Sequence, residues 1–195
     1  MTPLADMPDV EDVPFQSFEV IEGGGFGGES RQSAAENPAE PGHDTTDPLT
    51  GLLNGSGLEP VLEREWSLAR RKAVASILVV ADVDRFKLIN EEAGADMGDR
   101  ALRIVGRVLN ECCRASDVVA RVGSADFVVI LVGAKGDQPT SYVDRVTARL
   151  ADDDRAPELS FGWTKLIHAT SPKHAIELAE ALMHKRRALS RTRAV

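Results

Sequence analysis

Apolar residues recur along the chain with two different periods, which predicts a domain of mixed helices and strands. From Gly57 to the basic cluster at residues 70–72 they recur at helical spacing, so we expect an amphipathic helix that packs against a sheet. Residues 76–83 instead form one continuous apolar run that ends with the aspartates Asp82 and Asp84. A run of this kind is typical of a central strand that is buried on both faces.

A β-hairpin is predicted at Gly123. Val-rich runs at residues 117–122 and 127–132 lie on either side of the segment Gly123-Ser124-Ala125-Asp126, and glycine relieves a backbone that turns through positive φ. The remaining periodic segments predict further helices at residues 88–92, 96–113, 139–150 and 172–189, and a strand at residues 159–167. The order of elements after the first helix is therefore βααββαβα.

Charge divides the chain into two parts. The net charge is −8, but residues 1–46 hold ten acidic residues and one basic residue, Arg31, so residues 47–195 are almost neutral. The first segment is rich in Pro, Gly, Ser and Glu and has little periodicity, so we predict an acidic, disordered tail before one domain. Residues 15–21 are more apolar than the rest of the tail. They are either part of a solvated tail or a short docking segment that becomes ordered on a partner.

The composition argues against several classes of protein. No run of 18 apolar residues is present to span a membrane, and we find no signal-peptide pattern at the N-terminus. Cys112 and Cys113 are adjacent, so we expect no disulfide framework, a reducing cytoplasm, and a cysteine pair that packs at a helix end. The histidines lack metal-ligand spacing, and the basic cluster at residues 185–193 lacks interleaved aromatics, so neither a zinc site nor a nucleic-acid partner is predicted.

Five short motifs follow one another between residues 47 and 191. They are Asp47–Leu52 (DPLTGL), Asp82–Asn90 (DVDRFKLIN), Gly98-Asp99, the hairpin Gly123–Phe127 (GSADF) and Ser160-Phe161-Gly162. In this order and spacing they resemble the GGDEF family, which contains bacterial diguanylate cyclases and their inactive relatives. The resemblance implies a palm-like α/β fold, in which helices flank a central, mostly antiparallel sheet.

The hairpin departs from the family pattern, and this departure decides what the resemblance implies about catalysis. Active members join two GTP molecules into cyclic di-GMP with bound Mg²⁺, held by carboxylates at positions that match Asp82 and Ala125. A methyl group cannot ligate a metal, and Asp126 is expected to be a poor substitute because successive side chains point to different faces. Ser124 also adds a side chain where the family keeps glycine. We therefore expect no Mg²⁺, no catalytic residue set and no enzymatic activity.

The other matching positions imply a degenerate nucleotide pocket. Asn90 and Asp99 stand at the spacing of the residues that hydrogen-bond guanine in active members; otherwise they are a turn residue and a helix-start acid. The C-terminal basic residues that bind phosphate in the family have no clean match among residues 185–187. The implied pocket consists of Asp82, Phe86, Asn90, Asp99, Gly123 and Asp126.

A second ligand site implied by the resemblance is intact. Arg114-Ala115-Ser116-Asp117 resembles the R-x-x-D inhibitory site at which family members bind cyclic di-GMP, and Arg145 stands where a second arginine is often supplied. A guanidinium offers two donors to guanine O6 and N7, while a carboxylate accepts from the guanine N–H edge. The alternatives are that Arg114 pairs only with Asp117, and that Arg145 is a solvated helix charge. Another such pair, Arg149 and Asp152, lacks the family position.

The sequence therefore predicts a catalytically inactive GGDEF-like domain, residues 47–195, that acts as a cytoplasmic receptor. It would bind cyclic di-GMP through Arg114, Asp117 and Arg145, form a ligand-induced homodimer and signal to an unidentified protein partner, without nucleic-acid or membrane partners. Two alternatives stay open. One is a weak diguanylate cyclase that uses Asp126, and the other is a module that binds GTP or only a protein.

Overall fold

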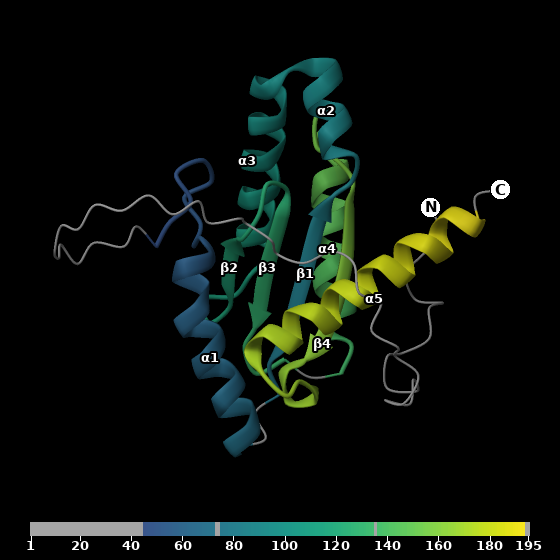
Figure 1. Ribbon diagram of the computed structural model, residues 1–195. Helices are drawn as coiled ribbons and strands as arrows, with labels where there is room; N and C mark the ends of the chain where they lie inside the picture. The colour runs from purple at the N-terminus through teal and green to yellow at the C-terminus, as the bar shows by residue number, and fades with distance from the viewer. Residues whose placement is uncertain (1–44, 73–74, 135, 194–195) are drawn as a thin grey trace, which may run out of the picture.

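A four-stranded sheet forms the middle layer of the structure, a computed structural model that describes residues 45–72, 75–134 and 136–193 (Figure 1). All neighbouring strands are antiparallel. The spatial order of the strands is β2 (Val118–Arg121), β3 (Asp126–Leu131), β1 (Ile77–Val83) and β4 (Leu159–Lys165). The expected α/β fold with an antiparallel central sheet is confirmed.

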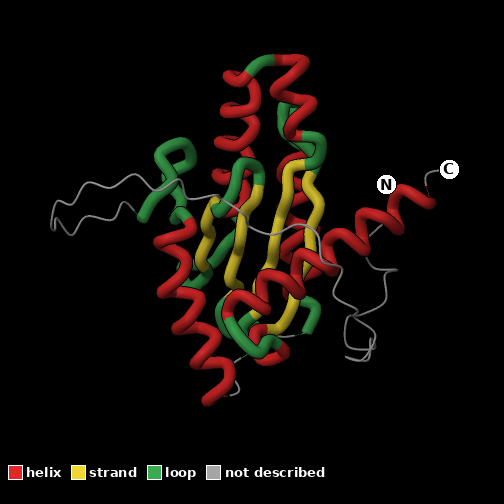
Figure 2. Tube along the Cα trace, in the orientation of Figure 1, coloured by secondary structure: helices red, strands yellow, loops and turns green. Residues whose placement is uncertain are grey.

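Helices cover both faces of the sheet (Figure 2). One face carries α1 (Gly55–Lys72) and α5 (Pro172–Arg193), and the other carries α3 (Ala95–Glu111) and α4 (Gln138–Ala151). Helix α2 (Phe86–Ala93) packs on α3, and the two extend beyond the end of the sheet (Figure 1). A short 3₁₀ helix, η4 (Leu166–His168), joins β4 to α5.

Strand β1 supplies side chains to both hydrophobic cores. Ile77, Val79 and Ala81 pack in the core beside α3 and α4, whereas Leu78 and Val80 pack in the core beside α1 and α5. This division follows from the pleat, which points successive side chains to opposite faces. Each large aliphatic side chain buried in this way contributes about 1.5–3 kcal/mol, so the continuous apolar run at residues 76–83 is what allows a sheet with a core on each side.

The expected elements agree with the structure except at their ends. The strand predicted at residues 159–167 ends at Lys165, because the backbone turns there into η4, and the last helix continues to Arg193. The cysteine pair lies at the end of α3 and packs against the core, as predicted. Among the described helices, none is long and apolar enough to cross a membrane. The predicted tail lies outside the described residues, apart from its last two.

The backbone of helix α5 lies close to the sheet at Gly162 on β4. A Cβ atom on this glycine would lie 2.1 Å from the carbonyl oxygen of Ala179 and 2.5 Å from the amide nitrogen of Met183. Both of these atoms belong to the backbone of α5, so they cannot move without displacing the helix. The Ser160-Phe161-Gly162 motif therefore has a steric basis, because only glycine lets α5 lie against β4 at this point.

We predict that Gly162→Ala lowers the free energy of unfolding by about 1–3 kcal/mol, the usual cost of inserting an atom into a packed core. Urea denaturation of both proteins measures the change. Gly55→Ala is the matched control, because no atom lies within 4 Å of the Cβ position at Gly55. Equal denaturation midpoints for wild type and Gly162→Ala would contradict the prediction.

Candidate functional site

The hairpin is anchored to the N-terminal turn motif by Asp47. Its carboxylate accepts hydrogen bonds from Arg121 Nη1 at 3.0 and 3.2 Å, and from the amide and hydroxyl of Thr50 at 2.9 and 2.6 Å. Burial opposes ionisation of Asp47, but the hydrogen bonds from Thr50 and Arg121 prevail and lower its pKa. Arg121 Nη2 also donates to the carbonyl oxygen of Ser124 at 2.9 Å. One arginine thus connects the DPLTGL segment to the turn of the hairpin.

Asp126, and not Ala125, shares a face of the sheet with Asp82. The register places Asp82 and Asp126 directly opposite each other on β1 and β3, so their side chains lie on the same face, toward α5. Ala125 is 6% exposed and packs in the core beside α3 and α4. The two neighbouring side chains point to different faces as expected, but the expectation that position 125 is the hairpin partner of Asp82 has to be corrected.

The carboxyl group of Asp126 is confined by its surroundings. Burial raises its pKa, and the negative charge of Asp82 raises it further. A Cβ atom on Gly123 would lie 2.3 Å from Asp126 Oδ2, so the carboxylate rests against the glycine of the turn. Gly123 and Asp126, both predicted to belong to the nucleotide pocket, are therefore in direct contact.

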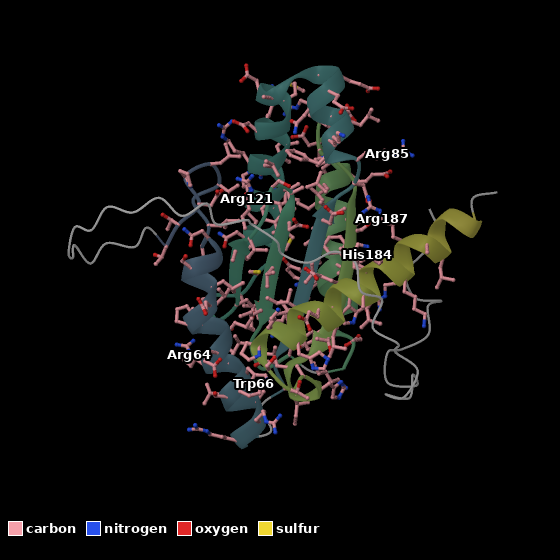
Figure 3. The ribbon with its side chains drawn as sticks, in the orientation of Figure 1. Arg64, Trp66, Arg85, Arg121, His184 and Arg187 are labelled. Atoms are coloured by element: carbon pink, nitrogen blue, oxygen red, sulfur yellow. The ribbon has the colours of Figure 1, made fainter. Side chains whose placement is uncertain are left out.

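Arg187 projects from α5 (Figure 3). Its guanidinium binds both aspartates at the end of β1. Its Nη1 lies 2.7 Å from Asp82 Oδ2, its Nη2 forms a second ion pair with Asp84, and the hydroxyl of Ser160 donates to Asp84 at 2.9 Å. Burial raises the pKa of Asp82 although Arg187 acts in the opposite direction. The side chains of Arg187, Asp82 and Asp84 are only about one-fifth exposed, at 22%, 21% and 21%.

Arg187 was not assigned to the site from the sequence, because residues 185–187 do not match the family motif cleanly, yet a signal for it exists there. Ala175, Ala179 and Met183 are buried against the sheet at intervals of four residues, and Arg187 is the next position in this row. A helix presents residues spaced by four on one face. A basic residue that continues the apolar face of the last helix is therefore expected to lie over the sheet, even where the family motif around it is lost.

The residues at the end of β1 do not fit a divalent metal ion as they are arranged. Such an ion needs several carboxylate oxygens at fixed geometry. Here one guanidinium binds Asp82 and Asp84, and Ala125 offers no ligand atom. Within the described ranges, no three His, Cys, Asp or Glu side chains are grouped so that they could hold a metal.

The positions predicted to contact guanine lie where α2 meets α3. A Cβ atom on Gly98 would lie 1.9 Å from Asn90 Oδ1 and 3.3 Å from a ring carbon of Phe86, so Phe86 and Asn90 both rest against Gly98. Asp99 forms an exposed ion pair with Arg103 at 3.8 Å. The structure thus brings Phe86 and Asn90 together at the end of the sheet, while Asp99 is engaged on the surface of its own helix.

The three residues predicted to bind cyclic di-GMP line one surface cavity. Arg114, Asp117 and Arg145 surround it together with residues of β3, α4 and the loop between them, and its volume is about 160 Å³. The guanidinium of Arg145 donates to the carbonyl oxygens of Ser141 and Cys112 at 3.2 Å each. These bonds hold the side chain of Arg145 along α4, so it is oriented by the protein although it is exposed.

Asp117, which lines this cavity, accepts hydrogen bonds from two backbone amides. Its Oδ2 accepts from the amide of Arg114 at 2.8 Å, and its Oδ1 accepts from the amide of Val132 at 3.0 Å. The alternative in which the Arg114 guanidinium pairs with Asp117 is not formed: among the described residues, their contact is through the backbone amide of Arg114. The carboxylate therefore joins the loop before β2 to the end of β3.

We predict that Asp117→Ala lowers the free energy of unfolding by about 1–3 kcal/mol, because it removes the acceptor of two backbone amides. Arg114→Ala should change this free energy by less than about 0.5 kcal/mol, since its side chain supports no other part of the fold. Thermal denaturation of both variants tests the difference. Asp152→Ala, at the exposed end of the second Arg-x-x-Asp pair, is the control, and an equal loss in all three variants would contradict the prediction.

Comparison with known proteins identifies the family model that fits the chain. The model described as diguanylate cyclase, GGDEF domain, matches residues 44–193. Diguanylate cyclase DgcP of Pseudomonas aeruginosa is 37% identical over 106 residues, which cover 54% of this chain and 16% of that protein. The chain spans between 16% and 34% of the length of the curated relatives named first in this comparison.

Solved structures share the fold. The coiled coil and GGDEF domain of DgcB from Caulobacter crescentus, in complex with c-di-GMP, align with a TM-score of 0.69 at 24% identity, covering 74% of this chain and 81% of that chain. Diguanylate cyclase SiaD from Pseudomonas aeruginosa, in complex with its activator SiaC, aligns with a TM-score of 0.68 at 25% identity, covering 74% of this chain and 58% of that chain.

Proposed function

Since the chain belongs to the family of the diguanylate cyclase GGDEF domain, as its motifs predict, we propose that it is a cyclic di-GMP receptor without cyclase activity. The ligand binds in the cavity lined by Arg114, Asp117 and Arg145, and the bound state is recognised by a protein partner. The single observation that carries this proposal is that Arg145, 28 residues after Asp117 in the sequence, lines one cavity together with Arg114 and Asp117.

The chemistry of the cavity suits a guanine base. Arg114 presents a fork of N–H donors that matches guanine O6 and N7, and no ion pair with Asp117 competes for it. Each oxygen of the Asp117 carboxylate accepts one backbone hydrogen bond, and a carboxylate has about four acceptor sites, so it keeps capacity for the N–H edge of guanine. The site therefore offers donors from Arg114 for guanine O6 and N7, and acceptors from Asp117 for the guanine N–H groups.

The size of the cavity favours a ligand shared between two copies of the chain. At about 160 Å³ it is smaller than the roughly 300–1,000 Å³ of sites that enclose a drug-sized ligand. It accommodates one base rather than a whole cyclic dinucleotide. The remaining surface of the ligand is then available to a second receptor molecule, which supports a ligand-induced homodimer.

Two relatives support the ligand and the partner. The DgcB structure holds c-di-GMP, and SiaD is bound to its activator SiaC. Both are similar in fold to this chain, so a GGDEF domain of this shape can present both kinds of surface. We extend the two properties, a cyclic di-GMP ligand and a protein partner, to this chain as parts of the proposal.

Absence of turnover is supported by the side chains at the end of β1. Ala125 supplies no carboxylate, and Arg187 holds Asp82 and Asp84. One observation favours the alternative, a weak cyclase, because Asp126 faces Asp82 across the strand pair. We favour the receptor because the two aspartates of β1 are already paired with a cation, and Asp126 alone cannot complete a metal site.

We predict that cyclic di-GMP binds with a Kd of about 1 µM or lower, and that Arg114→Ala weakens binding by about 1.5–3 kcal/mol, the range for hydrogen bonds to a charged group. Isothermal titration calorimetry measures both, with GTP as the competitor expected to bind poorly. Arg149→Ala, in the second Arg-x-x-Asp pair, is the matched control and should leave the affinity unchanged. No binding heat in the wild type well above micromolar ligand would refute the receptor.

We also predict that the purified protein makes no cyclic di-GMP from GTP with Mg²⁺ or Mn²⁺. Product analysis by chromatography is the measurement. Ala125→Glu should not restore activity, because Ser124 remains in the turn and side chain 125 points into the core beside α3 and α4. Product formation that disappears in Asp126→Asn would establish the weak cyclase instead.

A further inference from the structure

We infer that Arg187 is an internal counter-ion: its guanidinium occupies the carboxylate cluster at the end of β1, so that this cluster holds an arginine in place of a divalent metal ion. The inference rests on the absence of turnover in the proposed function and supplies a physical cause for it. It does not depend on the binding of cyclic di-GMP at Arg114, which lies at the other end of the β2–β3 hairpin.

One guanidinium bridges two carboxylates in this cluster. Asp82 and Asp84 are two positions apart, one at the end of β1 and one just beyond it, and both carboxylates meet Arg187. Nη1 binds one and Nη2 the other, so the planar fork of the guanidinium bridges them. Ser160 on β4 donates a further hydrogen bond to Asp84 at 2.9 Å. Each partner is thus fixed by a separate strand or helix.

Burial makes this arrangement hard for a hydrated metal ion to displace. The three side chains are about one-fifth exposed, so solvent and salt screen their attraction less than on the surface. A guanidinium is weakly hydrated, whereas Mg²⁺ loses its water shell reluctantly. Exchange of Arg187 for Mg²⁺ would require both dehydration of the ion and release of the arginine into solvent.

The packing of α5 delivers the guanidinium to this position. Ala179 and Met183 lie against the sheet, and the absence of a side chain on Gly162 allows that close approach. Arg187 follows Met183 by one helical turn, so its side chain extends from a helix that is already fixed. Asp126 lies beside Asp82, with His184 and Glu180 of α5 also near this pair.

Removal of Arg187 should convert the cluster into a metal site. Asp82 would then have the carboxylates of Asp84 and Asp126 as neighbours without the guanidinium. As arranged in the structure the three do not form a metal-binding group, so their side chains have to rotate toward one another to bind the ion. Mn²⁺ alone is the probe, titrated into wild type and Arg187→Ala and followed by electron paramagnetic resonance of free Mn²⁺. We expect no saturable binding by the wild type at millimolar Mn²⁺, and an affinity at least about tenfold higher in the variant. The variant should also have a Tm lower by about 5–10 °C, which Mn²⁺ partly restores.

Two controls make the result specific. Arg149→Ala removes a half-exposed arginine that pairs with Glu111 and Asp152, and it should create no Mn²⁺ site. Asp82→Asn added to Arg187→Ala should abolish the gained binding. If Arg187→Ala does not fold, Arg187→Gln takes its place, and the wild-type titration still decides.

Saturable Mn²⁺ binding by the wild type that Asp82→Asn abolishes overturns the inference, as does an Arg187 variant that folds but gains no affinity. No nucleotide is present in this experiment. A negative result in the Mn²⁺ titration can therefore be told apart from a negative result in the cyclic di-GMP titration. It can also be told apart from the detection of cyclic di-GMP as a reaction product.

Discussion

Strand β1 is hydrogen-bonded along both edges and buried on both faces, and this double constraint determines the rest of the domain. Its neighbours β3 and β4 both run antiparallel to it, and helices cover its two faces, α3 and α4 on one side and α1 and α5 on the other. The cost of leaving backbone amides of such a strand unpaired in an apolar core is high. The apolar run therefore places β1 in the middle layer, with a hydrophobic core on each side.

The same pleat separates structural from chemical positions at the end of the strand. Residues 77, 79 and 81 point to the core beside α3 and α4, while Leu78, Val80 and Asp82 point toward α5. Asp126 joins Asp82 on that face because it is its partner in the ladder, and Ala125 is left in the opposite core. A change of one position in the hairpin register would exchange these two roles.

The β2–β3 hairpin connects the two candidate sites. At one end, Asp117 ties the loop before β2 to Val132 and lines the cavity together with Arg114. At the other end, Arg121 ties the turn to Asp47, and Gly123 supports the carboxylate of Asp126. The residues that line the cavity and the carboxylates under α5 are therefore connected through one short pair of strands.

Periodicity and short motifs in the sequence determine the elements, their order and the family, because these depend on local patterns that repeat along the chain. They also identify Arg114, Asp117 and Arg145, which line one cavity in the structure. Only the tertiary structure decides that Asp126 faces Asp82, that Asp117 is engaged by backbone amides, and that Arg187 reaches across from α5. Each of these depends on strand register or on contact between segments that are about 15 to 105 residues apart in the sequence. A local sequence pattern does not specify which distant segments come into contact.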